Sequence, residues 1–385
     1  MLRITFVGAF EPITDPSNAA TSAAGNLVQC EILETLKNRT HYSDTDVSAV
    51  SHRPRRAWPY GPCYSRASRI DSVDLPGFVN LPVLKHVIFG VSLFFWLLKN
   101  KPNLVIAYNP GPFETLAFLV CRLLSSNLFA ASIIQDIHTG AGKLKSIRAL
   151  SDCFSMALAR RLDLVIPISP FIIEDFSLRK DRAIVFRGGM TRQSRELLSA
   201  EPEDLEPYAV FAGALEPYNG LDILLSKWTK VEGDLVLHVF GKGSLSSLAS
   251  EWSQRTARIV YHGFAHEDII TRWQAKAAVN FCFRYSKGIN QRYFFPSKFF
   301  NVLAAPGAAV ANRFDGFPAD VADNCYLVND DLSNLPEIIQ TALSRKDSTE
   351  DLAARRKWLE VNAEWGSLLQ GILDVYHEHD SVESP

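Results

Sequence analysis

The C-terminal half of the sequence carries a cluster of cationic side chains that could bind a phosphorylated ligand. The four cations lie within fifteen residues: Arg284, Lys287, Arg292 and Lys298. Lys298 follows Pro296 and Ser297, which predict the start of a helix, where unpaired backbone N–H groups add positive potential. A departing diphosphate requires such stabilisation where its charge develops. We therefore expect this segment to bind a diphosphate; the alternative is a solvated surface loop.

Three glycine-bearing segments precede this cluster, and each follows an apolar, strand-like run. Their candidate ligand-binding residues are Gly213, Glu216 and Asn219 in 211–222, Gly241 and Lys242 in 239–245, and His262, Gly263 and Phe264 in 259–264. Glycine at the end of a strand lets backbone N–H groups approach an anion closely. One such segment alone more often indicates an ordinary turn, so the prediction depends on the group as a whole.

The N-terminal half offers a candidate general base for activating a hydroxyl group. Asp136 and His138 follow the apolar run 131–134. Imidazole titrates near neutral pH, which suits it to accept a proton, and Asp136 would orient the ring or act in its place. The alternative is that His138 only hydrogen-bonds to the protein.

Other polar residues of this half follow expected strands and should border an acceptor hydroxyl. They are Glu11, Asn18, Tyr108, Asn109 and Glu114. Of these, Glu11 and Glu114 are alternative bases, each less favoured than His138. The nucleophile would then be a hydroxyl group of the acceptor and not of the protein.

The elements that position these residues follow from the alternation of short apolar runs with helix-length segments. Continuous apolar runs are typical of buried parallel strands, and their alternation with helices predicts a parallel sheet with crossovers. In the first half the expected strands are 4–7, 104–107, 131–134, 164–168 and 183–186, and the expected helices are 25–37, 84–99, 114–124, 147–160 and 171–178. Ligands of such sheets bind outside the carboxyl ends of the strands.

A second unit of the same kind follows a polar stretch. Its expected strands are 208–212, 235–240, 257–262, 278–283 and 308–311, and its expected helices are 221–229, 245–255, 266–275, 298–304 and 335–344. We therefore divide the chain into a first Rossmann-like domain, 1–190, a linker, 191–207, a second Rossmann-like domain, 208–350, and a helical tail, 351–385. A length of 385 residues agrees with two α/β domains.

The order and spacing of the C-terminal segments resemble the donor half of GT-B glycosyltransferases, especially glycosyltransferase family 4. The residues that carry the resemblance are Gly213, the Gly-x-Gly of 241–243, Gly263 and the Pro-Ser-Lys of 296–298. The resemblance covers about residues 1 to 345 and is sharp only in the C-terminal half. It implies two Rossmann-like doubly wound domains facing a cleft. It also implies that the first domain, 1–190, binds the acceptor, that the second domain, 208–350, binds a UDP- or GDP-linked sugar donor, and that no metal or cofactor is required.

Four positions depart from the family pattern. Ala214 and Asn219 stand where the family usually has an arginine and a lysine that neutralise the diphosphate. Tyr293 and Asn301 stand where it has the paired glutamates of its E-x7-E motif. Asn301 could still hydrogen-bond to ribose hydroxyls. We therefore expect the donor phosphates to rest on residues 284–298 and on helix N-termini, and the retaining mechanism of the family is not implied here.

The resemblance implies hexosyl transfer to a carbohydrate or lipid-linked acceptor, in surface polysaccharide or glycoconjugate biosynthesis. Two alternatives stay open: a nucleotide-sugar 2-epimerase of the same architecture, and a catalytically degenerate binding protein. An epimerase would require more acidic and histidine residues around the site than His138 and His262. A nicotinamide dehydrogenase is remote, because the turn after Val7 is not G-x-G-x-x-G.

Composition restricts the partners and the location. The net charge of -2 argues against a nucleic-acid binder. None of the six cysteines has metal-site spacing, and we expect free thiols in a reducing cytoplasm. The uncharged, strongly apolar run 87–98 has only twelve residues and is too short to span a bilayer. The segment 84–98 predicts a buried helix; the alternative is a shallow contact with the inner face of the membrane.

Overall fold

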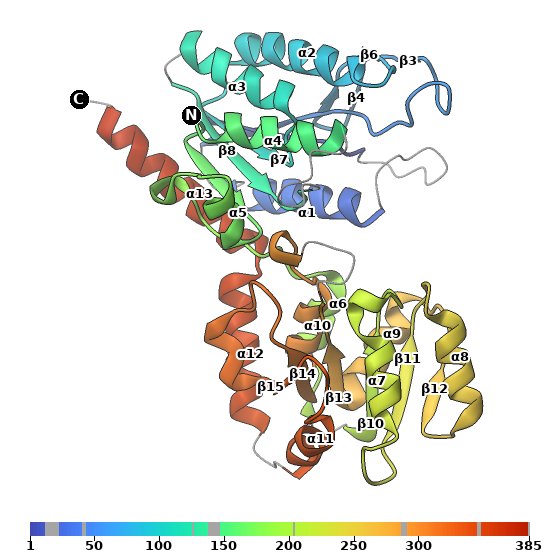
Figure 1. Cartoon of the computed structure of the whole chain (residues 1–385). Helices are drawn as coiled ribbons and strands as arrows, with labels where there is room; N and C mark the ends of the chain where they lie inside the picture. The colour runs from blue at the N-terminus through green and yellow to red at the C-terminus, as the bar shows by residue number, and fades with distance from the viewer. Residues whose placement is uncertain are drawn as a thin grey trace. The chain divides into compact units, whose positions relative to one another are not determined.

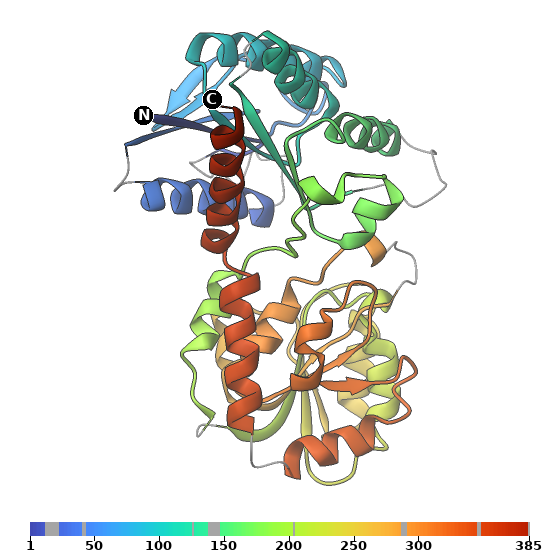
Figure 2. The ribbon, with the colours of Figure 1, turned by 90° about the vertical axis from the view of Figure 1, so that its left-hand side faces the viewer.

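A computed structural model of the chain describes residues 1–11, 23–40, 44–124, 127–137, 147–202, 205–285, 291–344 and 348–383. The chain divides into two compact units. Unit 1 comprises Met1–Arg187 and Trp365–Pro385, and unit 2 comprises Gly188–Glu364. Figure 1 labels the elements of each unit, and Figure 2 shows the same ribbon turned by 90°.

Unit 1 is built on a seven-stranded sheet in the order β4-β5-β2-β1-β7-β8-β9. The strands are β1 (Leu2–Gly8), β2 (Thr45–Ser51), β4 (Ser68–Ile70), β5 (Val73–Leu75), β7 (Leu104–Tyr108), β8 (Phe129–Ile134) and β9 (Leu164–Pro167). All described pairings in this sheet are parallel except that of β4 with β5. A separate two-stranded sheet pairs β3 (Tyr64–Ser65) with β6 (Phe78–Val79). The central strands are buried on both faces, which explains why their sequences are continuous apolar runs.

Helices cover both faces of this sheet (Figure 1). They are α1 (Ala23–Thr40), α2 (Leu84–Asn100), α3 (Pro112–Leu124), α4 (Ile147–Ala159), α5 (Pro170–Asp175) and α13 (Trp365–Glu383). Ile32 and Leu36 of α1 share one core with Leu369 and Ile372 of α13, so the last helix of the chain belongs to unit 1. α5 begins where the Ser169 hydroxyl caps the backbone N–H of Phe171 and a proline occupies the first turn.

Unit 2 is built on a six-stranded sheet in the order β12-β11-β10-β13-β14-β15, with every neighbouring pair parallel. The strands are β10 (Glu206–Ala212), β11 (Val236–Phe240), β12 (Ile259–Tyr261), β13 (Ala277–Cys282), β14 (Ala308–Asn312) and β15 (Tyr326–Val328). The helices are α6 (Arg192–Leu198), α7 (Leu221–Trp228), α8 (Ser246–Arg255), α9 (Glu267–Lys276), α10 (Lys298–Ala304), α11 (Leu335–Ser344) and α12 (Ser348–Asn362). Short 3-10 helices include η3 (Pro217–Asn219) and η4 (Gln291–Tyr293).

The two faces of the second sheet have separate cores. Leu224 of α7, Ala249 of α8 and Ile339 of α11 pack on one face. Leu197 of α6, the apolar residues of α10 and Leu359 of α12 pack on the other. Helices on both faces of a parallel sheet make this unit, like unit 1, a doubly wound domain, as the sequence predicted.

The observed division differs from the expected one at both ends of unit 2. The segment 191–207, expected as a linker, lies in unit 2 and contains α6. Thr191 caps this helix by accepting a 3.2 Å hydrogen bond from the Ser194 backbone N–H. The tail, 351–385, is divided: α12 packs in unit 2 and α13 in unit 1.

Three further expectations need correction. The run 183–186 is no strand, because within it only Ala183 forms a single parallel bridge with Val165. β2 and β15 were not expected from the sequence. The α2 helix is not buried on every side: Phe89 and Leu93 are buried, whereas Val91 and Phe95 are exposed. In the part of the chain that the structure describes, no helix is long and apolar enough to cross a membrane.

Candidate active site

Each sheet has one point where the strand order reverses, and each of these points carries a cavity. In unit 1 the reversal lies between β1 and β7, and in unit 2 it lies between β10 and β13. Consecutive connections leave such a pair of strands in opposite directions, so a crevice opens outside their carboxyl ends. Val7 and Tyr108 line the cavity of unit 1, and Ala212 and Cys282 line that of unit 2.

The cavity of unit 2 has a volume of about 220 Å3 and combines aromatic side chains with two cations. The cations are Arg284, directly after β13, and Lys298, the first residue of α10. Gly213 and Asn219 come from the loop after β10. The sequence predicted these four residues for the donor site, and the fold brings them together. Pro296 and Ser297 also line the cavity, as predicted.

The Arg284 guanidinium is fixed by neighbours that do not neutralise it. It lies over the Tyr218 ring at 4.8 Å from the ring centroid and donates a 3.1 Å hydrogen bond from Nη1 to the Asn219 side chain. Its buried Nε has no hydrogen-bond partner in the described part of the chain. Burial disfavours the charged form and lowers the pKa of Arg284. An anion in the cavity would restore the lost solvation and use the free donor.

The Lys298 ammonium lies at the carboxyl end of β10. Nζ donates a 3.1 Å hydrogen bond to the carbonyl oxygen of Ala212. Although solvent reaches the side chain, loss of hydration around the ammonium lowers the pKa of Lys298. Among the described residues, neither Lys298 nor Arg284 forms an ion pair with a carboxylate. The pair therefore supplies two positive charges without a directly paired carboxylate to one small cavity, and Glu267 acts on Lys298 only through a weaker electrostatic attraction.

Backbone hydrogen bonds join the glycine loops beside this cavity. The Gly213 N–H donates to Phe240 at the end of β11, and the Gly241 N–H donates to Gly263 after β12. Gly241 has no room for a side chain, because a Cβ atom there would lie 1.8 Å from the Gly213 carbonyl oxygen. The predicted glycine segments thus form one continuous edge of the sheet.

Glu216 occupies a different place from the one expected. Its carboxylate accepts hydrogen bonds from the Ser244 backbone N–H at 3.0 Å and from the Ser244 hydroxyl at 2.6 Å. These bonds lower the pKa of Glu216 and fix the loop before α8. Both carboxylate oxygens bind Ser244, so Glu216 positions the Gly-x-Gly loop. Glu216 is not among the residues that line the cavity.

His262 belongs to an aromatic cluster away from the cavity. Its ring stacks on Phe240 at a centroid distance of 4.3 Å, and its Nε2 lies 2.8 Å from His238 Nδ1. Burial lowers the pKa of His262. Next to it, Phe264 is 71% exposed and lies 4.8 Å from the Lys242 ammonium. Lys242 and Phe264 therefore form an exposed pair beyond the same sheet edge.

Asn301 does not face the cavity. It is buried, and its Oδ1 accepts a 2.5 Å hydrogen bond from the Ser194 hydroxyl while Nδ2 donates to the Gln193 side chain at 3.2 Å. These bonds join α10 to α6, so the expected contact with ribose hydroxyls is not supported. Arg292 lies in η4, outside the residues that line the cavity. Lys287 lies outside the described residues.

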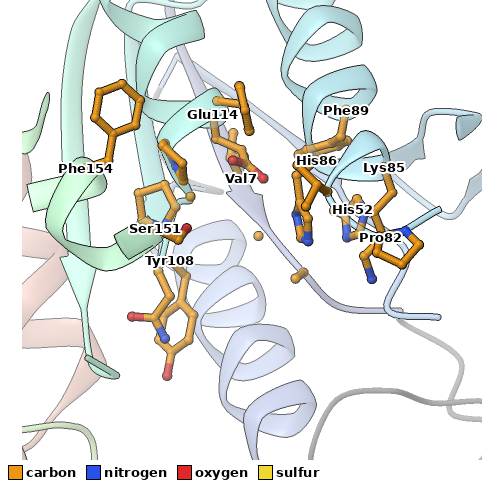
Figure 3. Close-up of a pocket in the computed structure, with 18 of the residues that line it drawn as sticks. Val7, His52, Pro82, Lys85, His86, Phe89, Tyr108, Glu114, Ser151 and Phe154 are labelled. Carbon is orange, nitrogen blue, oxygen red and sulfur yellow. The ribbon is translucent and has the colours of Figure 1, made fainter. Parts of the chain in front are cut away.

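The cavity of unit 1 is larger, about 880 Å3, and its lining is mainly apolar. Figure 3 shows Glu114 of α3, His86 of α2 and His52 directed into one space. Of the predicted acceptor-side residues, Tyr108, Asn109 and Glu114 line this cavity. Glu114 is 7% exposed, and burial raises its pKa to about 7. Gly111 makes room for this carboxyl group, because a Cβ atom there would lie 2.7 Å from Oε2.

Asn109 organises the loop after β8. Its Oδ1 accepts a 2.7 Å hydrogen bond from the Gln135 backbone N–H, and its Nδ2 donates to the Asp136 carboxylate at 3.2 Å. Asp136 lines a smaller neighbouring cavity, of about 80 Å3, that shares Asn109 with the large one. Burial and the nearby Asp136 charge raise the pKa of Tyr108. His138, the favoured base, lies outside the described residues.

Glu11, another predicted acceptor-side residue, is not among the residues that line this cavity. Glu11 forms an ion pair with Arg53 at 3.2 Å, so its charge is already compensated and it is poorly placed as a base. Asn18 lies outside the described residues. The sequence reasoning missed His52, His86 and Ser151, all of which line the cavity. His52 follows β2, a strand that was itself not expected, so no strand end marked its position.

Comparison with solved structures identifies the fold. The chain is similar to HepE of Anabaena, solved in complex with UDP, with 14% identity over 98% of this chain and 100% of that chain and a TM-score of 0.63. It is also similar to the α,α-trehalose 6-phosphate synthase of Burkholderia multivorans, with 12% identity over 100% and 99% and a TM-score of 0.64. The lipopolysaccharide outer core galactosyltransferase WaaB gives 13% identity over 97% and 99%, with a TM-score of 0.63.

These likenesses extend over the whole chain and confirm the predicted GT-B fold. No protein-family model matches the sequence, and no curated protein matches it significantly. Membership of glycosyltransferase family 4 stays a prediction.

Proposed function

We propose that the chain is a glycosyltransferase that moves a sugar from a nucleotide-sugar donor to an acceptor hydroxyl. The observation that carries the proposal is the pair of cations, Arg284 and Lys298, without an acidic partner among the described residues at the strand-order reversal of unit 2. Two desolvated positive charges on one small cavity are suited to the diphosphate of a nucleotide sugar. The UDP and UDP-glucose complexes of HepE support this assignment by analogy of fold.

The chemistry assigned to the site is a single group transfer. The acceptor oxygen bonds to the anomeric carbon, the bond from that carbon to the diphosphate breaks, and the acceptor proton passes to a base. Arg284 and Lys298 stabilise the charge that develops on the departing diphosphate. We assign the base to His138, with Asp136 or Glu114 as substitutes. Because the protein's own cations stabilise the leaving group, we propose that the transfer requires no metal.

The donor is proposed to be linked to UDP or GDP, and the acceptor to be a carbohydrate or a lipid-linked molecule of polysaccharide or glycoconjugate biosynthesis. A lipid-linked acceptor would bring the protein to the inner face of a membrane. Exposed apolar side chains on α2 and α3 support such a contact: Val91, Phe95, Leu123 and Leu124.

A substitution on this surface tests the membrane contact. Phe95→Glu should reduce co-sedimentation with anionic lipid vesicles. If Phe95→Glu and the wild type bind the vesicles equally, this surface of α2 and α3 does not contact the membrane.

One experiment tests the proposed function against its alternatives. The protein is incubated with UDP-, GDP- and TDP-sugars, with and without acceptor lipid extract, in the presence and absence of EDTA. Nucleotide release that requires the acceptor and persists in EDTA supports metal-independent transfer. A C2-epimer formed without acceptor supports the epimerase. Nucleotide binding without turnover under every condition supports the degenerate binding protein.

A further inference from the structure

The large cavity of unit 1 contains two buried polar atoms that lack hydrogen-bond partners. Glu114 Oε2 and His52 Nε2 are both inaccessible to solvent and without a partner among the described residues. The two side chains are 7% and 5% exposed, respectively, and both line the same cavity. Figure 3 shows that they reach it from different elements, Glu114 from α3 and His52 from the segment after β2.

Leaving such atoms unpaired destabilises the fold by about 1–3 kcal/mol each. A ligand that hydrogen-bonds to both would remove that cost, and the surrounding packing holds them in place for it. The His52 ring stacks between Phe78, at a centroid distance of 4.7 Å, and His86, at 5.2 Å. Glu114 is fixed in the first turn of α3, against Gly111.

The rest of the lining defines the body of the ligand. Apolar side chains dominate it, including Val7, Phe89 and Phe113. Three apolar residues line the cavity and are also exposed to solvent: Val83, Leu150 and Phe154. Apolar side chains therefore connect the surface with the cavity that Glu114 and His52 line.

The charges of the lining exclude an anionic ligand. Burial lowers the pKa of His52 to about 3 and that of His86 to about 4, so both rings are neutral at physiological pH. Burial also lowers the pKa of Lys85, whose ammonium donates to the Arg55 carbonyl oxygen at 3.4 Å. An anion would find only this weakly stabilised cation and would meet the Glu114 carboxyl group.

We propose that this cavity binds an uncharged amphipathic alcohol, with its hydroxyl group hydrogen-bonded to Glu114 Oε2 or to His52 Nε2 and its alkyl or aryl body along the apolar lining. A hydroxyl group both donates and accepts, so it can pair with a carboxyl oxygen or with an imidazole nitrogen. The inference rests on the proposed function only in naming this alcohol as the sugar acceptor. The binding itself requires no nucleotide.

Calorimetric titration of the full chain, without nucleotide, tests the proposal with two isomeric probes. 1-Octanol carries a hydroxyl group, whereas dibutyl ether has the same formula and no donor. The wild type should bind 1-octanol about five- to tenfold more tightly, the ratio expected for one net hydrogen bond. His52→Phe and Glu114→Met keep apolar volume but remove one polar partner each, and the variant that lacks the partner of the hydroxyl group should bind both probes about equally.

Equal binding of the two probes by the wild type would overturn the proposal, whatever the variants do. Tighter binding of methyl glucoside than of octyl glucoside would overturn it as well, because it would place a polar body in the cavity. Titrations with UDP and with GDP are run in parallel. Alcohol selectivity without binding of either nucleotide leaves the cavity assignment standing and contradicts the proposed transferase. Nucleotide binding without alcohol selectivity overturns the cavity assignment and leaves the proposed transferase standing.

Discussion

Lys298 lies so close to Gly213 that a Cβ atom at Gly213 would come within 2.6 Å of the lysine Nζ. The same ammonium is bonded to the carbonyl oxygen of Ala212, the residue before the glycine. A glycine at the end of β10 thus determines where the cation of α10 can rest. The turn and the lysine, far apart in sequence, form one structural unit of the proposed donor site.

Gly213→Ala should weaken UDP binding while leaving the protein folded. The new methyl group displaces the Lys298 ammonium, which can move because it ends a flexible side chain, and about tenfold in Kd is expected for one misplaced charge-assisted hydrogen bond. Isothermal titration with UDP measures the loss. Gly233→Ala is the matched control, because Gly233 also has a positive φ but a Cβ atom there would meet nothing within 4 Å. Equal UDP affinity in both variants would contradict the role of Lys298.

Arg284→Met should reduce UDP affinity more strongly than Gly213→Ala does. The substitution removes a desolvated guanidinium whose Nε is free to donate, and one charge-assisted hydrogen bond contributes about 1.5–3 kcal/mol, so at least a tenfold rise in Kd is expected. Methionine retains apolar contact with Tyr218. Exposed Arg313 provides the control: Arg313→Met should bind UDP as the wild type does. A wild-type Kd for Arg284→Met would remove the cavity of unit 2 from the donor site.

The fold and the sheet edge of the donor site could be predicted because their signals are local. Buried parallel strands such as β10 and β13 consist mainly of apolar residues, and the glycine that follows β10 is visible in the sequence. Their carboxyl ends must meet at one edge of the sheet. Arg284 and Lys298 could therefore be placed together without knowledge of their contacts.

The direction of individual side chains could not be predicted, because it depends on neighbours distant in sequence. Asn301 is turned towards Ser194 and Gln193, more than a hundred residues earlier, and the polar segment that contains them gave no sign of packing against α10. His52 was missed for a related reason. It follows β2, whose Thr-Asp-Val-Ser sequence lacks the apolar run that marked the other central strands.

The titration of Glu114 should contribute a loss of stability as pH rises from about 4.5 to 7, and the difference between the wild type and Glu114→Gln isolates it from the opposing titration of the buried histidines. Burial raises its pKa from an ordinary value of 4.5 to about 7, so the folded state binds more protons than the unfolded state in this window. The shift corresponds to about 3 kcal/mol, present below pH 4.5 and lost above pH 7. Urea unfolding of the wild type and Glu114→Gln across the window measures it. The free energy of unfolding of Glu114→Gln minus that of the wild type should be about 3 kcal/mol larger at pH 8 than at pH 4.5. A difference that does not change with pH would contradict the burial of the carboxyl group.

His52 should act in the opposite direction and make the protein sensitive to acid. Its pKa is lowered from 6.5 to about 3, first by burial and then by His86 and Lys85, so the unfolded state binds the proton more readily. The contribution of the neutral His52 ring to the free energy of unfolding is fully present above pH 6.5. It is lost as pH falls, by about 3 kcal/mol at pH 4. His52→Phe should lose correspondingly less stability between pH 7 and pH 4 in urea titrations. His86 remains in this variant, so partial acid sensitivity is expected to persist. An unchanged acid profile would show that the His52 ring is accessible to water.

Arg355→Met should destabilise unit 2 without changing its donor site. The guanidinium is buried and donates to four backbone carbonyl oxygens, those of Leu303 at 3.3 Å, Asn324 at 3.4 Å, Ala305 at 3.1 Å and Gly307 at 3.0 Å. Methionine fills similar volume but leaves these acceptors without their donor, so a loss of about 3 kcal/mol in the free energy of unfolding is expected.

Lys357→Ala, an exposed change two residues later on α12, is the control and should alter stability by less than about 0.5 kcal/mol. Urea unfolding compares the two variants. The bonds from Arg355 hold the C-terminal end of α10 and the turn after it, whereas Lys298 stands at the other end of that helix. The folded fraction of Arg355→Met should therefore bind UDP with the wild-type Kd. If Arg355→Met is as stable as Lys357→Ala, the four hydrogen bonds from Arg355 do not stabilise unit 2. If Arg355→Met is stable but binds UDP more weakly, Arg355 instead positions Lys298.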